Sequence, residues 1–171
     1  MRRLIAAFVF CLVLTPAYAQ RQEPVGCDKF KWPLDSERAL LRAPDAAKIA
    51  SGAEIAVPTT KAATIKLDPF TDAKLPMAPE RAPRSTDSKA GFVKVVAPAQ
   101  AGRYHITLSA GGWIDVIQDG RFTKSGDASG VEGCEGIRKS VTFDLAATPF
   151  IVQFTGVTPD TIGMVMTPVK P

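Results

Sequence analysis

The stretch GRYHITL, residues 102–108, decides the fold class of this 171-residue chain. Its apolar residues alternate with polar ones, which is the period of a β-strand that buries one face. The stretch KSVTFDL, residues 139–145, shows the same alternation. We expect the two apolar faces to meet in one core. The inward-facing residues would be Tyr104, Ile106 and Leu108 in the first stretch and Val141, Phe143 and Leu145 in the second.

Around these two stretches, short runs rich in Val, Ile, Thr and Phe are separated by Gly, Pro, Asp and Ser. That pattern is typical of a sandwich or a barrel. It predicts a mainly β protein, an antiparallel jelly-roll-like β-sandwich. The predicted strands are 54–57, 62–67, 91–97, 102–109, 113–118, 139–144, 150–155 and 162–167.

A short N-terminal helix is expected ahead of the strands. Asp35 or Ser36 can begin it, good helix formers follow, and Pro44 stops it. Its leucines would pack on the body of the protein, while Glu37, Arg38 and Arg42 face water. The predicted organisation is a lead and helix over residues 20–52 and a sandwich domain over residues 53–171.

Residues 1–19 have the pattern of a secretory signal peptide. Arg2 and Arg3 precede an apolar run, and Ala17-Tyr18-Ala19 forms a small-x-small cleavage site. The apolar run is too short to cross the roughly 30 Å core of a bilayer, so no membrane span is expected. The mature chain would begin at Gln20 and be periplasmic or secreted, and we expect it to be a monomer.

Removal of the signal peptide would also remove Cys11 and leave two cysteines, Cys27 and Cys134. In an oxidising compartment this pair predicts one disulfide. A metal or redox role is the alternative, but the pair lacks Cys-x-x-Cys spacing and further ligands.

The charge of the chain gives little support to nucleic-acid binding. Arg2 and Arg3 account for two of the 21 basic residues, which leaves 19 against 17 acidic ones. No basic run with interleaved aromatic residues appears, and exported proteins rarely meet nucleic acid. We expect no nucleic-acid partner.

His105 is the single histidine of the chain, which removes many reaction classes. Ordinary zinc, copper and two-histidine iron centres need more than one, and no G-x-S-x-G motif supports a serine nucleophile such as Ser109 or Ser125. Alternation turns His105 away from the core. We expect no metal and no cofactor.

Two long segments separate the predicted strands. Residues 68–89 hold four prolines and little periodicity, so they either wrap the sandwich or form a mobile binding edge. Residues 119–138 hold five glycines and Cys134, and form the better candidate for a site. Calcium binding and glycosidase chemistry are alternatives for this second loop, although the spacing of its carboxylates fits neither pattern. Those carboxylates are Asp119, Asp127, Glu132 and Glu135.

The candidate ligand-binding residues flank this glycine-rich loop. Trp113 and Asp115 share one strand face, and Asp119-Gly120 predicts a turn. An exposed aromatic ring beside a carboxylate is suited to a sugar or a peptide. If the register is opposite, Trp113 is a core residue instead. The predicted site comprises Trp113, Asp115, Asp119 and Arg121.

Over residues 91–167 the chain resembles the bacterial pre-peptidase C-terminal type of β-sandwich. The resemblance lies in the Gly-x-Tyr strand at residues 102–108, the strand leading into Asp119-Gly120, and the run 151–154. It implies a jelly-roll-like module of secreted proteins, and the loop around Cys134 departs from that family's pattern.

The mature chain is also similar to a group of small exported alphaproteobacterial proteins of uncharacterised function. The shared motifs are Cys-x-x-Phe-x-Trp-Pro at residues 27–33, Pro-Glu-Arg-Ala-Pro at 79–83, and Trp-Ile-Asp-Val with Arg-Lys-Ser-Val at 113–116 and 138–141. Some members are mislabelled homogentisate dioxygenase, an enzyme whose iron needs two histidines and a carboxylate. One histidine cannot supply that site.

Together these features predict an exported, non-catalytic binding or accessory module. Its partner would be a carbohydrate, an envelope polymer or an envelope protein. The alternatives are a small secreted hydrolase that uses loop carboxylates and a purely structural envelope protein.

Overall fold

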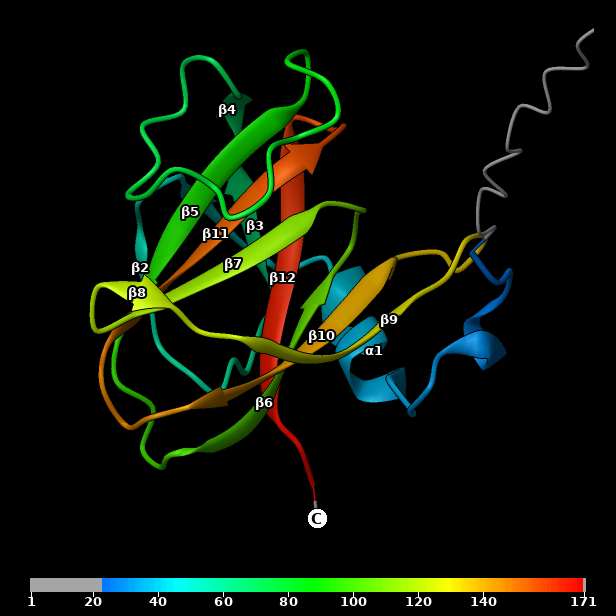
Figure 1. The fold of residues 1–171 in the computed structure, drawn as a ribbon. Helices are drawn as coiled ribbons and strands as arrows, with labels where there is room; N and C mark the ends of the chain where they lie inside the picture. Colours follow the sequence, from blue (N-terminus) through cyan, green and yellow to red (C-terminus); the bar gives the residue numbers. More distant parts are fainter. Residues whose placement is uncertain (1–22, 171) are drawn as a thin grey trace, which may run out of the picture.

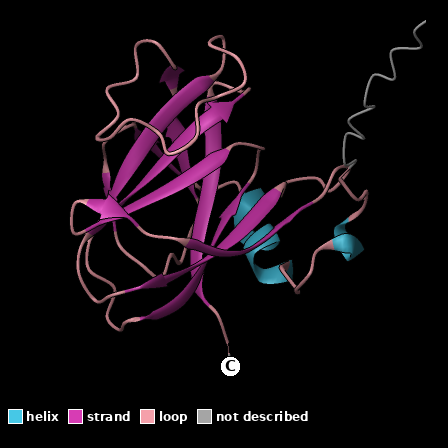
Figure 2. Cartoon of the chain, in the orientation of Figure 1, coloured by secondary structure: helices cyan, strands magenta, loops and turns pink. Residues whose placement is uncertain are grey.

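A computed structural model describes residues 23–170, so the predicted signal peptide lies outside the described residues. Two β-sheets pack face to face, and a short helix lies against one of them (Figure 1; Figure 2). The β-sandwich with a short N-terminal helix is therefore confirmed. Within the described residues, no helix is long and apolar enough to cross a membrane.

The first sheet has the order β1-β3-β12-β6-β10-β9. At its centre lie the two stretches that predicted the fold, β6 and β10, which pair antiparallel with Phe143 opposite Tyr104. The bounds of its strands are β1 (Ala47–Ala50), β3 (Ala63–Lys66), β6 (Gly102–Leu108), β9 (Ser125–Gly130), β10 (Lys139–Leu145) and β12 (Thr161–Pro168).

The second sheet has the order β2-β5-β11-β7-β8, and a short strand, β4, also pairs with β5. Both sheets interleave strands from distant parts of the sequence, because the chain crosses between the sheets several times. The bounds are β2 (Glu54–Ile55), β4 (Asp68–Pro69), β5 (Lys89–Val95), β7 (Trp113–Gln118), β8 (Arg121–Phe122) and β11 (Phe150–Val157).

One apolar core fills the space between the sheets. All six residues expected from alternation in β6 and β10 belong to it, together with Ile114 and Val116 of β7. At about 25 cal/mol per Å² of apolar surface removed from water, this burial is the main favourable contribution to folding. The inward faces of the central strands therefore follow the sequence pattern closely.

Two features depart from the sequence prediction. The pairs β1·β3 and β2·β5 are parallel, so both sheets are mixed rather than purely antiparallel. Strand β1 precedes the expected sandwich boundary at residue 53, and β9 lies inside the expected glycine-rich loop. The β9 sequence, SGDASG, contains no good strand former, and its order comes from pairing with β10 across a bulge.

The N-terminal lead and helix cover the outer face of the first sheet. A 3-10 turn, η1 (Cys27–Lys29), leads into α1 (Asp35–Arg42), which contacts β12. The predicted disulfide between Cys27 and Cys134 is present. Beside it Leu34 packs with Val131 and Ile137 in a second, smaller apolar cluster. The disulfide therefore fastens the covering segment to the loop that follows β9.

The proline-rich segment 68–89 covers the outer face of the second sheet. Figure 1 shows this green segment running across β5 and β11 toward β7. Its backbone is tied to the sheet by hydrogen bonds from Met77 N to Gln153 Oε1, at 3.5 Å, and from Glu80 N to Asp115 Oδ2, at 3.3 Å. Of the two alternatives for this segment, the structure has the one in which it wraps the sandwich.

Replacing Cys27 and Cys134 together by Ser is expected to lower the free energy of unfolding by up to about 4.7 kcal/mol, because the bridge closes a loop of about 100 residues. Urea denaturation of the variant and of the oxidised protein measures the difference. Reduction of the unchanged protein by dithiothreitol should give the same loss. Coinciding denaturation midpoints in all three samples would contradict a stabilising effect of the disulfide.

Candidate functional site

Trp113 and Asp115 lie on the outer face of the second sheet, opposite to the core residues Ile114 and Val116. Trp113 is half-buried, whereas Asp115 is only 3% exposed because the proline-rich segment covers it. Trp113 is therefore not a residue of the core between the sheets. Alternation along β7 predicts that Trp113 and Asp115 share a face, but it leaves open whether that face is the core or the outer one, and it does not show that the outer face is covered.

Asp115 accepts three hydrogen bonds in this covered position. Trp113 Nε1 donates to Oδ1 at 2.6 Å, and Glu80 N and Gln153 Nε2 donate to Oδ2 at 3.3 Å. Burial raises the pKa of Asp115 above its usual range, and the three donors oppose that rise. Asp115 thus fixes the indole ring of Trp113 and the backbone of the proline-rich segment, and has little freedom to contact a ligand.

An open pocket of about 550 Å³ lies beside Trp113. It forms where five parts of the chain meet. These are Glu23, the proline-rich segment, and the ends of β7, β10 and β11. Its volume lies within the usual range for small-molecule sites. The residues that line it include Glu23, Arg81, Arg84, Trp113, Lys139 and Thr155.

Two cationic groups lie against the Trp113 ring. The guanidinium carbon of Arg81 is 5.3 Å from the ring centroid, and Lys139 Nζ is 5.5 Å from it. Both distances are within the range of cation–π attraction. Lys139 Nζ also donates to the backbone oxygen of Gly112 at 2.7 Å.

Lys139 is an unusual lysine because it is half-buried among like charges. Burial lowers its pKa, Arg81 and Arg138 lower it further, and Glu23 opposes them. Arg138 forms ion pairs with Glu23 and with the loop carboxylate Glu132. No such ion pair is found for Lys139 within residues 23–170.

The wall of the pocket also holds a polar group without a protein partner. Thr155 is 1% exposed, and its Oγ1 finds no hydrogen-bond partner among the described residues. A buried hydroxyl group without a partner costs free energy. Thr155 lies directly opposite Trp113 in the pairing of β11 with β7, and is therefore placed beside the aromatic ring.

The other two predicted site residues, Asp119 and Arg121, lie at the opposite end of β7. Asp119-Gly120 forms the predicted turn, with φ of 53° and 73° at the two residues. Asp119, Gly120 and Arg121 are all exposed. Six residues of extended chain separate Asp119 from Trp113, or about 20 Å. The structure thus brings Trp113 and Asp115 together and leaves Asp119 and Arg121 apart from them.

The carboxylates of the glycine-rich segment do not gather into one site either. Asp119 lies in the β7–β8 turn, Asp127 lies in β9, Glu132 pairs with Arg138, and Glu135 pairs with Arg42. In the part of the chain that the structure describes, no group of three or more His, Cys, Asp or Glu residues could hold a metal ion. Calcium binding and paired-carboxylate chemistry gain no support here.

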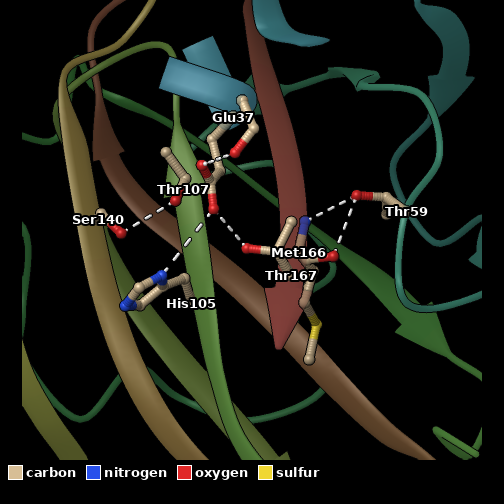
Figure 3. Close-up of polar contacts among 8 residues, drawn as sticks. Glu37, Thr59, His105, Thr107, Ser140, Met166 and Thr167 are labelled. Atoms are coloured by element: carbon tan, nitrogen blue, oxygen red, sulfur yellow. Dashed lines mark hydrogen bonds and ion pairs between the residues drawn. The ribbon is translucent and has the colours of Figure 1, made fainter. Parts of the chain in front are cut away.

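His105 takes part in a separate polar network on the outer face of the first sheet (Figure 3). Glu37 of α1 lies at its centre. Thr167 Oγ1 donates to Glu37 Oε1 at 2.6 Å, Ser36 Oγ donates to Oε2 at 2.8 Å, and His105 Nδ1 lies 3.9 Å from Oε1. Glu37 is only 5% exposed, so the expectation that it faces water is wrong. The sequence gives no sign of this, because Glu37 lies on a short polar helix.

The Glu37 network has the features of a structural connection. His105 points away from the core as expected, but Trp32 stacks on it with ring centroids 5.0 Å apart and planes 8° apart. Burial by itself raises the pKa of Glu37, yet the nearby His105 side chain and the hydrogen bonds from Thr167 and Ser36 outweigh it and hold the pKa at about 2. Neither of the serines considered as a nucleophile is in this network, since Ser109 Oγ accepts from Gly163 N and Ser125 lies in β9.

Comparison of the chain with protein-family models, with characterised proteins and with solved structures finds no match. The resemblances to pre-peptidase C-terminal sandwiches and to small exported alphaproteobacterial proteins therefore stay predictions.

The low pKa of Glu37 predicts a specific loss of stability in acid. The pKa falls from 4.5 in the unfolded chain to about 2 in the fold. The ionised carboxylate therefore contributes stability that is present above pH 5 and is lost as the pH falls toward 2, a contribution of about 3 kcal/mol. Urea denaturation between pH 2 and 7 should show this loss, and Glu37→Gln should remove most of it.

Glu135→Gln is the matched control, because Glu135 is an exposed carboxylate of the same type. That variant should keep the pH dependence of the unchanged protein. Parallel stability curves for the unchanged protein and Glu37→Gln would contradict the role of Glu37.

Proposed function

We propose that the protein is an exported, non-catalytic binding module whose site is the pocket around Trp113, and that its ligand is a carbohydrate of the cell envelope. The observation that supports this most directly is the half-buried Trp113 ring in the wall of an open pocket. Aromatic rings offer a flat apolar surface of the kind that sugar rings contact. The hydroxyl-bearing residues Ser85, Ser88, Thr155 and Thr158 are also among those that line the pocket.

The pocket favours binding over hydrolysis because it offers no free pair of carboxylates. Its two acidic lining residues are Glu23, which is paired with Arg138, and Asp87, while Asp115 is buried and accepts three hydrogen bonds. Acid–base hydrolysis of a glycoside needs two carboxyl groups free to face the scissile bond. The hydrolase alternative therefore has less support than a binding role.

Export is the second part of this proposal. The disulfide is compatible with export, as is the finding that no helix of the described residues is long and apolar enough to cross a membrane. The leader-like sequence at residues 1–19 favours export. Expression of the full chain in a Gram-negative host, followed by mass spectrometry of the periplasmic fraction, should give a protein that begins at Gln20. Retention of Met1 in the cytoplasmic fraction would contradict export.

Replacing Trp113 by Ala should abolish glycan binding while the domain stays folded, because the ring lies outside the core between the sheets. A thermal-shift screen of the exported, oxidised protein against envelope glycans identifies the ligand. A ligand at 100 times its Kd stabilises the folded protein by about 2.7 kcal/mol. The same glycan should give no shift with the Trp113→Ala variant.

The matched control is the double variant Asp119→Ala with Arg121→Ala, at the far end of β7. It should respond to the glycan as the unchanged protein does. If Trp113→Ala unfolds the domain, or if it retains the full shift, the pocket is not the binding site. A flat screen would favour a purely structural role in the envelope.

A further inference from the structure

We infer that the Trp113 pocket is one part of a longer basic groove, and that this groove takes a polyanionic polysaccharide rather than a neutral one. The inference rests on the proposed function, because it names the chemical class of the glycan at the same site. Three observations support it, namely the continuity of two pockets, the balance of charges along them, and the position of Lys139 where they join.

A second open pocket, of about 430 Å³, adjoins the first. Glu23, Gly112 and Lys139 line both pockets, so the two pockets meet at these residues, and we treat them together as one groove. The second pocket extends the site past the start of β10 to β9 and the N-terminal lead. An extended groove is suited to several consecutive units of a polymer. Further residues that line it are Lys29, Lys31, Ser129 and Arg138.

The groove has more basic than acidic side chains. The basic residues are Lys29, Lys31, Arg81, Arg84, Arg138 and Lys139, and the acidic ones are Glu23 and Asp87. Lys29 pairs with Asp28, and Arg138 pairs with Glu23 and Glu132. The other four basic residues form no ion pair within residues 23–170. The net charge of the whole chain is only +4, so this excess is local.

Lys139 lies at the junction of the two pockets and faces like charges. Arg81 approaches it from the proline-rich segment, Arg138 is its neighbour in sequence, and Glu23 is the one carboxylate that offsets them. An anion bound between Arg81 and Lys139 would reduce this repulsion and favour the charged lysine. Both groups already lie against the Trp113 ring, so an acidic group on a sugar that contacts the ring would meet them.

The hydroxyl group of Thr155 supports a sugar acid rather than a simple anion. Its Oγ1 is buried without a partner among the described residues, in the wall of the groove beside Trp113. Because Oγ1 is buried, a sugar hydroxyl or carboxylate could exchange a hydrogen bond with it once the Thr155 side chain turns toward the groove. The site thus combines an aromatic surface, two cations and a hydroxyl group.

The test compares an oligogalacturonate with its fully methyl-esterified form, because the pair shares the sugar backbone and differs in charge. Titration calorimetry of the exported, oxidised protein should give saturable binding of the acid and at least about tenfold weaker binding of the ester. Affinity for the acid should fall as salt is raised from 50 to 500 mM, because ions screen exposed charges.

The double variant Arg81→Gln with Lys139→Gln should weaken binding of the acid at least about tenfold, so that its affinity approaches that of the ester. The control is Lys94→Gln with Lys124→Gln, two exposed lysines outside the groove, which removes the same charge. That control should bind as the unchanged protein does. Thermal denaturation confirms that both variants are folded.

The outcomes separate this inference from the proposed function. Equal binding of acid and ester would keep a glycan site at Trp113 and overturn the preference for polyanions. Equal losses in the two double variants would show non-specific attraction and would also overturn it. Binding of neither oligosaccharide, when a neutral glycan binds and depends on Trp113, overturns this inference alone. Binding of no glycan at all overturns both.

Discussion

Two buried carboxylates hold the outer layers of this protein in place. Glu37 projects from α1 and accepts a hydrogen bond from Thr167 of the first sheet. Asp115 projects from the second sheet and accepts one from the backbone of Glu80 in the proline-rich segment. Outer faces of antiparallel sheets usually contact water. Here each is covered by a segment with little regular structure, and a hydrogen-bonded carboxylate is what ties each segment to its sheet.

The two carboxylates differ in their electrostatics, although both are almost fully buried. Glu37 faces His105 and two hydroxyl groups, and its pKa is held at about 2. Asp115 faces an indole, an amide side chain and one backbone amide, and burial raises its pKa. Protonation of Glu37 therefore favours the unfolded chain, whereas protonation of Asp115 favours the folded one. The cover over the first sheet is thus the more sensitive of the two to acid.

The sequence predicts the sandwich well because alternation reports which residues of β6 and β10 face the core. It cannot report which residues of the covering segments meet the outer faces, since the proline-rich segment has no periodicity, α1 is short, and both meet the sheets through long-range contacts. For this reason the sequence predicts an exposed Glu37 side chain, although the side chain is buried, and it does not predict the burial of Asp115. The sequence does not predict strand β9 either. Its Ser- and Gly-rich sequence has low strand propensity, and pairing with β10 decides its conformation.

The candidate site is likewise predictable from the sequence only where its residues lie close together in the chain. Trp113 and Asp115 could be placed on one face from the sequence, whereas Arg81 and Lys139 come from segments more than 25 residues away and meet the ring only in the fold. Asp115 links these parts, because it fixes the indole of Trp113 through one oxygen and the backbone of Glu80 through the other. Arg81 follows Glu80 directly, so the bond that fastens the covering segment also sets the distance between the cation and the aromatic ring. Asp115 is therefore better understood as a positioning residue than as a ligand contact.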